Sequence, residues 1–264
     1  MIDGLRIAVT LLTIVPLRSS ASVDRTRAGW AMAFAPLVGL ALGVAAALLL
    51  FLVRAGVGFE DTSLVPALVT LLGLAVVTGG LHLDGLADLA DGFGARRDRE
   101  GTLTVMRTPT VGAFAVVAVV MAIGLQASAL TLAVERHHGT LALILAIVAG
   151  RTAVTVACAG RAAPARPEGL GALVAGSVPR ARALAVVALA ALLAVVLGLL
   201  DPHAGGVGVA LHAVLALAGG LLAAAGLRLL AVRKLGGING DVLGALVETA
   251  TTVTLLLVAA EPFS

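Results

Sequence analysis

Long apolar stretches alternate with short charged segments along this chain. A helix needs about 20 apolar residues to cross the hydrocarbon core of a bilayer, and hydrocarbon cannot satisfy free backbone groups, so a crossing segment must be helical. The fold class predicted is therefore all-α, a polytopic bundle of about seven transmembrane helices that forms one membrane-embedded domain over residues 1–264. The seven predicted spans are Ala28–Val53, Thr62–Leu81, Thr108–Val134, Gly139–Gly160, Ala183–Leu200, Ala204–Leu227 and Val242–Ala260.

The N-terminal stretch Gly4–Leu17 is also apolar, but it is too short to span and Pro16 closes it. A small-residue cleavage site does not follow it, so the segment does not have the pattern of a signal peptide. We predict a short interfacial or re-entrant helix here.

Basic residues are concentrated in alternate loops between the predicted spans. The loops rich in basic residues contain Arg6, Arg18, Arg25 and Arg27; Arg96, Arg97, Arg99 and Arg107; Arg161, Arg166, Arg180 and Arg182; and Arg233 with Lys234. The intervening loops hold only Arg54 and Arg136. Loops rich in Lys and Arg stay in the cytoplasm, so we predict a multi-pass protein of a prokaryotic inner (plasma) membrane, N-terminus inside and C-terminus outside.

Composition agrees with a membrane protein and narrows the partners. Hydrophobic residues make up 60% of the chain and charged residues 12%, and the mean hydropathy is +1.10, which a soluble protein does not reach. The single Cys158 excludes a disulfide framework and a cysteine metal site. Although the net charge is +3, the chain lacks a basic patch with aromatic residues, so we expect a lipid bilayer and no nucleic acid as partner. The Gly39-x-x-x-Gly43 spacing indicates close helix packing, within the chain or in a homo-oligomer.

Three carboxylates, Asp84, Asp88 and Asp91, follow the glycine pair Gly79-Gly80 at the end of the second span. Their i, i+4, i+7 spacing places them within about 60° of one another on a helix. Three like charges on one face repel unless a cation neutralises them, and oxygen ligands suit Mg²⁺. A solvated helix end with acidic residues by chance is the alternative.

A second acidic segment begins the last span, where Gly236-Gly237-Ile238-Asn239-Gly240-Asp241 is followed by Glu248. Asp241 and Glu248 again share a helical face, and an ionisable residue inside a span is a functional candidate by default. The alternative is a structural Glu248 that pairs with Arg151 or His212. The two acidic segments resemble each other, which suggests two half-sites that converge on one metal-bound substrate.

Carboxylates, a metal ion and arginines at a membrane surface suit phosphoryl transfer. The transition state spreads negative charge over phosphate oxygens, which cations neutralise, and glycine pairs let backbone amides approach a phosphate. Candidates for the cationic clamp are Arg96, Arg97 and Arg107.

The glycine pair and the first acidic segment together resemble the signature of a known family. The run Gly79-Gly80-Leu81-His82-Leu83-Asp84-Gly85-Leu86-Ala87-Asp88-x-x-Asp91-Gly92 is similar to the signature of cobalamin-5′-phosphate synthase, adenosylcobinamide-GDP ribazoletransferase. Three further segments resemble that family in the same order: Phe34–Gly39, Glu168–Gly171 and Leu235–Ala245.

The resemblance implies a Mg²⁺-dependent membrane transferase of late cobalamin biosynthesis. It would join the corrinoid adenosylcobinamide-GDP to α-ribazole or α-ribazole 5′-phosphate and release GMP. In that assignment Asp84 and Asp88 are catalytic, and the metal ligands are Asp84, Asp88, Asp91, Asp241 and Glu248. The residues that would contact substrate are His82, Gly79, Gly80, Arg107, Gly237, Asn239 and Gly240.

The chain departs from the family pattern at three places. Thr108-Pro109 follows Arg107 where the family usually has an acidic residue and then Ser, so an acidic ligand there would be lost or replaced, for example by Asp98. Asn239 stands where Thr is common, and Thr251 stands where a further acidic residue is often present.

Three other classes of protein share parts of this pattern. A CDP-alcohol phosphotransferase needs an Arg soon after Asp-Gly-x-x-Ala, which Asp84–Asp88 lacks. A polyprenyl transferase uses denser Asp-Asp-x-x-Asp clusters. A cation-coupled transporter needs ionisable residues near the bilayer midplane and broken spans, whereas the acidic residues here are predicted at one surface.

Overall fold

The computed structural model describes residues 1–17, 23–56, 62–203 and 205–260, so Arg18 and Ala204 lie outside the described residues. Over these ranges every regular element is a helix, and two isolated backbone bridges connect loops. The helices are α1 (Ile2–Leu12), α2 (Arg25–Gly56), α3 (Leu64–Val77), α4 (Leu81–Gly94), α5 (Arg99–Val105), α6 (Ala113–Glu135), α7 (Gly139–Ala157), α8 (Leu170–Val174), α9 (Arg180–Leu199), α10 (Val207–Leu235) and α11 (Gly240–Ala259).

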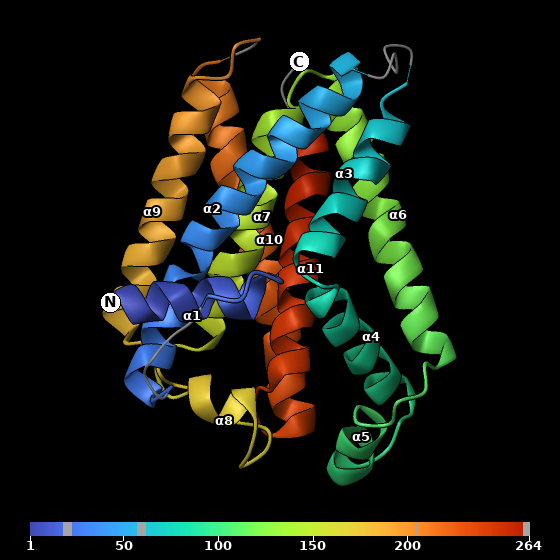
Figure 1. The fold of residues 1–264 in the computed structure, drawn as a ribbon, viewed down its shortest axis with the longest axis vertical. Helices are drawn as coiled ribbons and strands as arrows, with labels where there is room; N and C mark the ends of the chain where they lie inside the picture. The colour runs from blue at the N-terminus through green and yellow to red at the C-terminus, as the bar shows by residue number, and fades with distance from the viewer. Residues whose placement is uncertain (18–22, 57–61, 204, 261–264) are drawn as a thin grey trace.

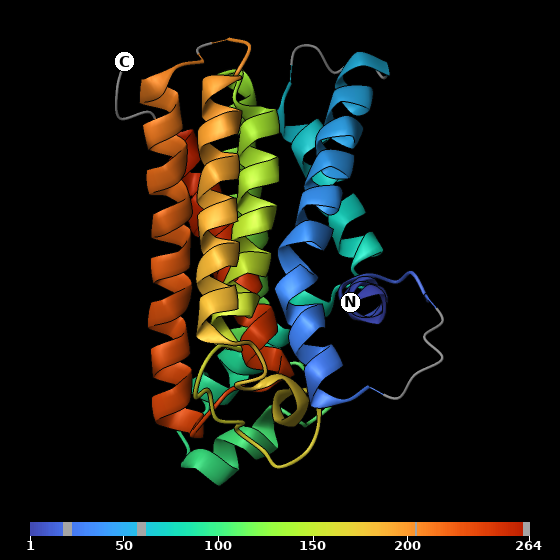
Figure 2. The same ribbon diagram turned by 90° about the vertical axis from the view of Figure 1, so that its left-hand side faces the viewer.

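Six of the described helices, α2, α6, α7, α9, α10 and α11, are long and apolar enough to cross a membrane. The pair α3 and α4 passes the same test together, with a bend of 89° between them. The long helices run side by side, and α1 lies across them (Figures 1 and 2). The prediction of a polytopic helical membrane protein with about seven spans and a short, non-spanning N-terminal helix is confirmed.

The second predicted span, Thr62–Leu81, is not one straight helix. Helix α3 ends at Val77, and the chain turns before α4 begins at Leu81. Gly79 and Gly80 have φ values of 61° and 68°, a region that glycine reaches without a Cβ penalty. Hydropathy alone does not reveal this bend, because apolar residues continue on both sides of the glycine pair.

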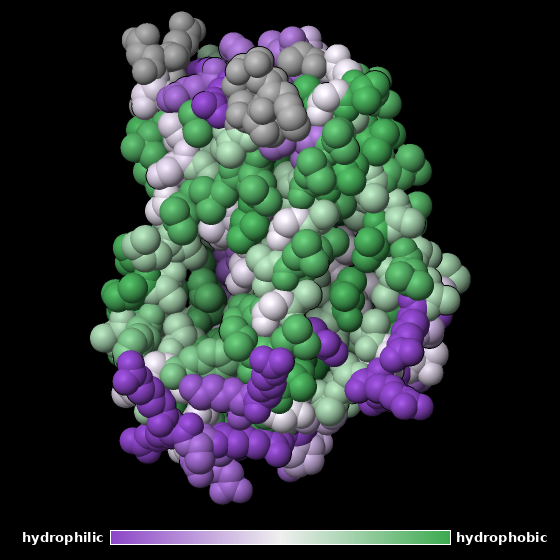
Figure 3. Space-filling model, turned by 180° about the vertical axis from the view of Figure 1, so that it is seen from behind, coloured by the Kyte–Doolittle hydropathy of each residue, from purple (hydrophilic) through white to green (hydrophobic). Residues whose placement is uncertain are grey.

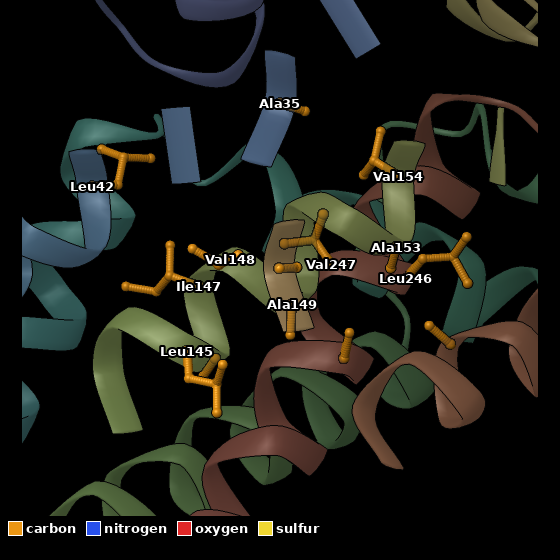
Figure 4. Close-up of a cluster of buried hydrophobic side chains, with 14 of the residues drawn as sticks. Ala35, Leu42, Leu145, Ile147, Val148, Ala149, Ala153, Val154, Leu246 and Val247 are labelled. Atoms are coloured by element: carbon orange, nitrogen blue, oxygen red, sulfur yellow. The ribbon is translucent and has the colours of Figure 1, made fainter. Parts of the chain in front are cut away.

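Helix α7 forms the centre of the bundle and is buried along almost its whole length. Its neighbours approach through small residues: a β-carbon on Gly43 would lie 2.9 Å from the Ile144 Cα atom, and one on Gly150 would lie 2.9 Å from the Val247 carbonyl oxygen. Such close backbone contacts are how helices pack in a membrane. Apolar side chains of α2 and α11 pack against those of α7 in this centre (Figure 4). The Gly39-x-x-x-Gly43 face therefore packs within the chain.

The outer surface is a broad apolar band with hydrophilic side chains along its lower end (Figure 3). At this end α2, α9 and α11 begin, and α4 and α10 finish beside α5 and α8 (Figure 1). Arg25, Arg97, Arg180 and Arg233 all belong to these helix ends and loops. We call it the arginine-rich end.

Candidate active site

Two glycines bring α4 and α11 into backbone contact. A β-carbon on Gly85 would lie 2.8 Å from the carbonyl oxygen of Asp241, and one on Gly244 would lie 3.1 Å from the carbonyl oxygen of His82. Any larger residue would push the helices apart, because the opposing atoms belong to the backbone. The two acidic segments identified in the sequence therefore lie side by side.

The crossing gathers three carboxylates from the two helices. Asp88 interacts electrostatically with Asp241, Asp84 and Asp91, and Asp241 also interacts with Asp84. Asp84 is exposed, while Asp88 and Asp241 are half-buried. Asp84 and Asp241 both line a pocket of about 250 Å³ that α1 borders on the other side. The structure thus brings together acidic residues that are more than 150 positions apart in the sequence.

Asn239 holds Asp241 at the start of α11. The Asn239 side-chain oxygen accepts a hydrogen bond from the Val242 backbone N–H (2.9 Å), which caps the helix. Its amide nitrogen donates to the Asp241 carboxylate (2.8 Å). Asn239 is buried, and Gly240 is the first residue of the helix behind it. Both ends of the amide are engaged within the protein, so the arrangement orients the Asp241 carboxylate.

Arg166 and Arg107 lie near the acidic cluster. Arg166 interacts electrostatically with both Asp241 and Arg107, and its guanidinium donates to the Leu103 carbonyl oxygen. Burial and the positive charge of Arg107 lower the pKa of Arg166, while the carboxylate of Asp241 opposes that change. Two cations held close together beside carboxylates suit a polyanionic substrate.

Gly237 allows the loop that carries Arg166 to pack against the start of α11. The Ile238 N–H donates to the Ala163 carbonyl (2.9 Å), and the Ala165 N–H donates to the Ile238 carbonyl (2.9 Å). A β-carbon on Gly237 would lie only 2.4 Å from the Ala163 oxygen. Gly237 therefore positions the loop beside Asp241.

A third arginine, Arg99 at the start of α5, supports the same loop. Its guanidinium donates to the Ala165 carbonyl oxygen (3.0 Å) and packs over Gly236. Arg96 and Arg97, which the sequence analysis proposed for a cationic clamp, are exposed in the turn between α4 and α5. Of the three proposed clamp residues, Arg107 lies near Arg166, and Arg166 in turn interacts with Asp241 of the acidic cluster.

Asp91 has a partner of its own on another helix. Its carboxylate oxygens accept hydrogen bonds from the backbone N–H groups of Gly112 (2.6 Å) and Ala115 (2.8 Å), at the N-terminus of α6. A carboxylate in this position satisfies free helix donors and favours the helix dipole. Both oxygens of Asp91 are thus used in joining α4 to α6.

Glu248 lies deeper than the acidic cluster, about 10 Å along α11 from Asp241, as seven residues of helix require. It accepts a hydrogen bond from the Gln126 side-chain amide (2.7 Å) and interacts electrostatically with Arg151. Arg151 was one of the two partners that the sequence left open, and its contact with Glu248 is electrostatic, whereas the hydrogen bond comes from Gln126. Glu248, Gln126 and Arg151 line a second cavity, together with His82.

The predicted glycine pair Gly79-Gly80 forms the bend between α3 and α4. Neither a phosphate nor another ligand is needed to explain these glycines, because their positive φ angles make the turn. His82, in the first turn of α4, is buried with 4% of its surface exposed and lines both cavities.

The donor set of the acidic cluster fits Mg²⁺. Among the described residues, no three His, Cys, Asp or Glu side chains lie close enough to hold a metal ion by themselves. Mg²⁺ is usually bound by one or two carboxylates, water and substrate phosphates, and not by a complete protein cage. Asp84, Asp88 and Asp241 supply carboxylate oxygens of this kind on two adjoining helices.

Sequence reasoning missed Arg166 and Gln126 as members of these sites. Arg166 is one of several arginines in its loop, and long-range contacts such as those of residues 163–165 with Ile238 place it beside Asp241. Gln126 is the one amide side chain within a long apolar span. That signal could have marked it as a partner for Glu248, since buried polar groups in a membrane pair with one another.

The fold and site define a polytopic helical membrane protein with a cluster of carboxylates and arginines at one end. Comparison with known proteins gives the family. The family model described as cobalamin-5-phosphate synthase matches residues 4–259.

Among curated proteins, the chain is similar to the adenosylcobinamide-GDP ribazoletransferase of Frankia casuarinae, with 48% identity over 96% of this chain and 93% of the relative. The protein of the same name from Bradyrhizobium diazoefficiens is 39% identical over 98% of this chain and 94% of the relative. The protein of that name from a Nocardioides species is 37% identical over 98% of this chain and 100% of the relative. No solved structure matches the chain. The chain belongs to the cobalamin-5-phosphate synthase family and is a membrane transferase of cobalamin biosynthesis.

Proposed function

We propose that this enzyme joins adenosylcobinamide-GDP to α-ribazole, or to α-ribazole 5′-phosphate, in a Mg²⁺-dependent reaction that releases GMP. The observation that carries the proposal is the α4–α11 crossing, which places Asp84 and Asp88 beside Asp241. The name of the relatives, adenosylcobinamide-GDP ribazoletransferase, mentions both adenosylcobinamide-GDP and ribazole and supports the proposal.

The reaction breaks the phosphoanhydride bond of the diphosphate and forms a phosphoester bond to the acceptor. A ribose hydroxyl oxygen of the acceptor attacks the phosphorus attached to the corrinoid side chain. The bond from that phosphorus to the bridging oxygen breaks, and GMP leaves with the oxygen and its electron pair. The hydroxyl proton passes to a base of the enzyme, so that atoms and charges balance.

The residues of the site have complementary roles in this scheme. Asp84 and Asp88 are the catalytic carboxylates, one of which accepts the hydroxyl proton. Arg107 and Arg166 attract the diphosphate and neutralise the charge that develops on its oxygens. Asn239 orients Asp241 toward the same space. Mg²⁺ held by these carboxylates and by the diphosphate would lower the repulsion between them.

The site lies at the arginine-rich end, and the positive-inside rule assigns this end to the cytoplasm. We therefore propose an active site on the cytoplasmic side of a prokaryotic plasma membrane, where GMP is released into the cell. The acceptor can then reach the site from the water or from the inner leaflet.

A direct test measures GMP release from adenosylcobinamide-GDP by chromatography, with purified protein in nanodiscs and α-ribazole as acceptor. We expect release with Mg²⁺ and none with EDTA. Asp84→Asn should lower the rate by about 100-fold or more, as for the loss of an electrostatic catalytic group. Glu100→Gln, on the exposed face of α5, is the matched control and should keep the wild-type rate. Release that is indifferent to EDTA, or an active Asp84→Asn enzyme, would refute the proposal.

A further inference from the structure

A second cavity lies within the membrane-spanning part of the bundle. It has a volume of about 340 Å³ and is bordered by α3, α4, α6, α7 and α11. Most of its walls are leucine, isoleucine and alanine side chains. Its polar lining residues are Thr78, His82, Gln126, Arg151, Glu248 and Thr251.

Two polar groups in this cavity have unused hydrogen-bonding capacity. Among the described residues, the His82 Nε2 and Arg151 Nε atoms are buried without a hydrogen-bond partner. His82 and Arg151 are only 4% and 5% exposed. Leaving such groups unsatisfied costs free energy, and ionisable residues at this depth mark functional sites. Because both side chains line the cavity, a ligand with an acceptor atom would satisfy either nitrogen once that side chain turned toward it.

The cavity adjoins the acidic cluster through His82. That residue lines the large cavity and also the smaller pocket that contains Asp84 and Asp241. A molecule that occupied both spaces would place one end among apolar walls and the other end beside the catalytic carboxylates.

We propose that this cavity binds the aromatic base of the ribazole acceptor, with the ribose extending past His82 toward Asp84. This inference rests on the proposed function and deepens it. A benzimidazole base is flat, uncharged and mostly apolar, and its free ring nitrogen is a hydrogen-bond acceptor that suits the donors of His82 or Arg151.

Size and polarity favour this occupant over the other parts of the substrates. A volume of about 340 Å³ is at the lower end of small-molecule pockets, and a corrin ring with its amide side chains is far too large for it. A lipid chain would fill the space but would leave the buried donors without partners.

The test measures binding of radiolabelled α-ribazole by equilibrium dialysis against protein in nanodiscs, with empty nanodiscs as blank. Ile123→Trp on α6 and Leu71→Trp on α3 fill the cavity from two sides. We expect both to weaken α-ribazole binding by about tenfold or more, since a pocket that loses its volume loses its ligand contacts. Their affinity for adenosylcobinamide-GDP should stay unchanged, which shows that the protein is folded.

Met121→Trp is the matched control, because Met121 lies on the same helix but is 55% exposed on the outer face. It should bind α-ribazole as the wild type does. Wild-type affinity in both cavity variants, or weaker binding of adenosylcobinamide-GDP in place of the acceptor, overturns the inference. If the wild type releases no GMP with both substrates present, the proposed function fails; if it does and the cavity variants keep acceptor binding, only this inference fails.

Discussion

Asp84 and Asp91 are chemically identical residues on one helix, and their surroundings give them different tasks. Asp84 is exposed at the pocket shared with Asp241, so its carboxylate can meet a substrate or an ion. Asp91 has both oxygens bound by backbone N–H groups of α6. The i, i+4, i+7 spacing puts them on one face, but the neighbouring helix decides which carboxylate remains available.

This difference predicts opposite effects for two matched substitutions. Asp91→Ala should destabilise the protein by about 1–2 kcal/mol, the cost of losing a helix cap, while the Mg²⁺ concentration for half-maximal rate stays the same. Asp84→Ala should leave the thermal unfolding midpoint nearly unchanged and abolish most of the activity. Thermal unfolding and Mg²⁺ titration of the rate check both. A changed Mg²⁺ requirement in Asp91→Ala with unchanged stability would make Asp91 a ligand and not a cap.

At the scale of elements, the crossing of α4 and α11 builds the site. The bend at Gly79-Gly80 turns α4 away from the axis of α3, and Gly85 and Gly244 then allow α4 to contact the first turns of α11. Both helices begin with an aspartate in the first turn, where the helix dipole favours negative charge. The acidic cluster is therefore a consequence of small residues at one contact.

Gly85→Ala tests that contact. Alanine is the better helix former, but its β-carbon would lie 2.8 Å from the Asp241 carbonyl oxygen, which cannot move independently of α11. We expect a loss of stability of about 1–3 kcal/mol, as for overpacking, and a lower rate of GMP release. Gly226→Ala in α10, where a β-carbon would meet nothing within 4 Å, is the control and should fold and react as the wild type. A normal rate and stability in Gly85→Ala would show that the helices do not need this approach.

The spans and the acidic segments could be predicted from the sequence, since run length and loop charge depend on local composition. The bend after Val77 could not, because glycine in an apolar run is equally compatible with a straight helix. The placement of Glu248 beside Gln126 and Arg151 depends on which helices are neighbours in the bundle. Because Asp241 and Glu248 share a helical face, the sequence predicted that they belong to one site. Their separation along α11 places them at different cavities. Arg166 depends on contacts between loops, which spacing does not encode.

At the scale of the whole molecule, charge and apolar surface define an orientation. The apolar band separates the arginine-rich end from the opposite end, where the α9–α10 turn and the end of α11 lie (Figures 1 and 3). The arginines of the site belong to loops that also set topology. The same charges can thus hold the protein in one orientation and attract an anionic substrate.

The orientation is testable by cysteine labelling. Cys158 is buried, so single cysteines introduced at exposed Arg97 and His203 can be labelled without interference. We expect a membrane-impermeant maleimide to label Arg97→Cys only in inside-out vesicles and His203→Cys only in right-side-out vesicles. The reverse pattern would place the acidic cluster outside the cell and remove the proposed cytoplasmic active site.

A double-mutant cycle on Asp84 and Asp241 tests most directly whether carboxylates from α4 and α11 act together on one diphosphate. The rate of GMP release would be measured for Asp84→Asn, Asp241→Asn and the double variant under saturating Mg²⁺. If both residues serve one site, each single change costs about 100-fold and the double variant is hardly worse than either. Losses that multiply, to about 10,000-fold, would mean that the two carboxylates act independently and would contradict the account.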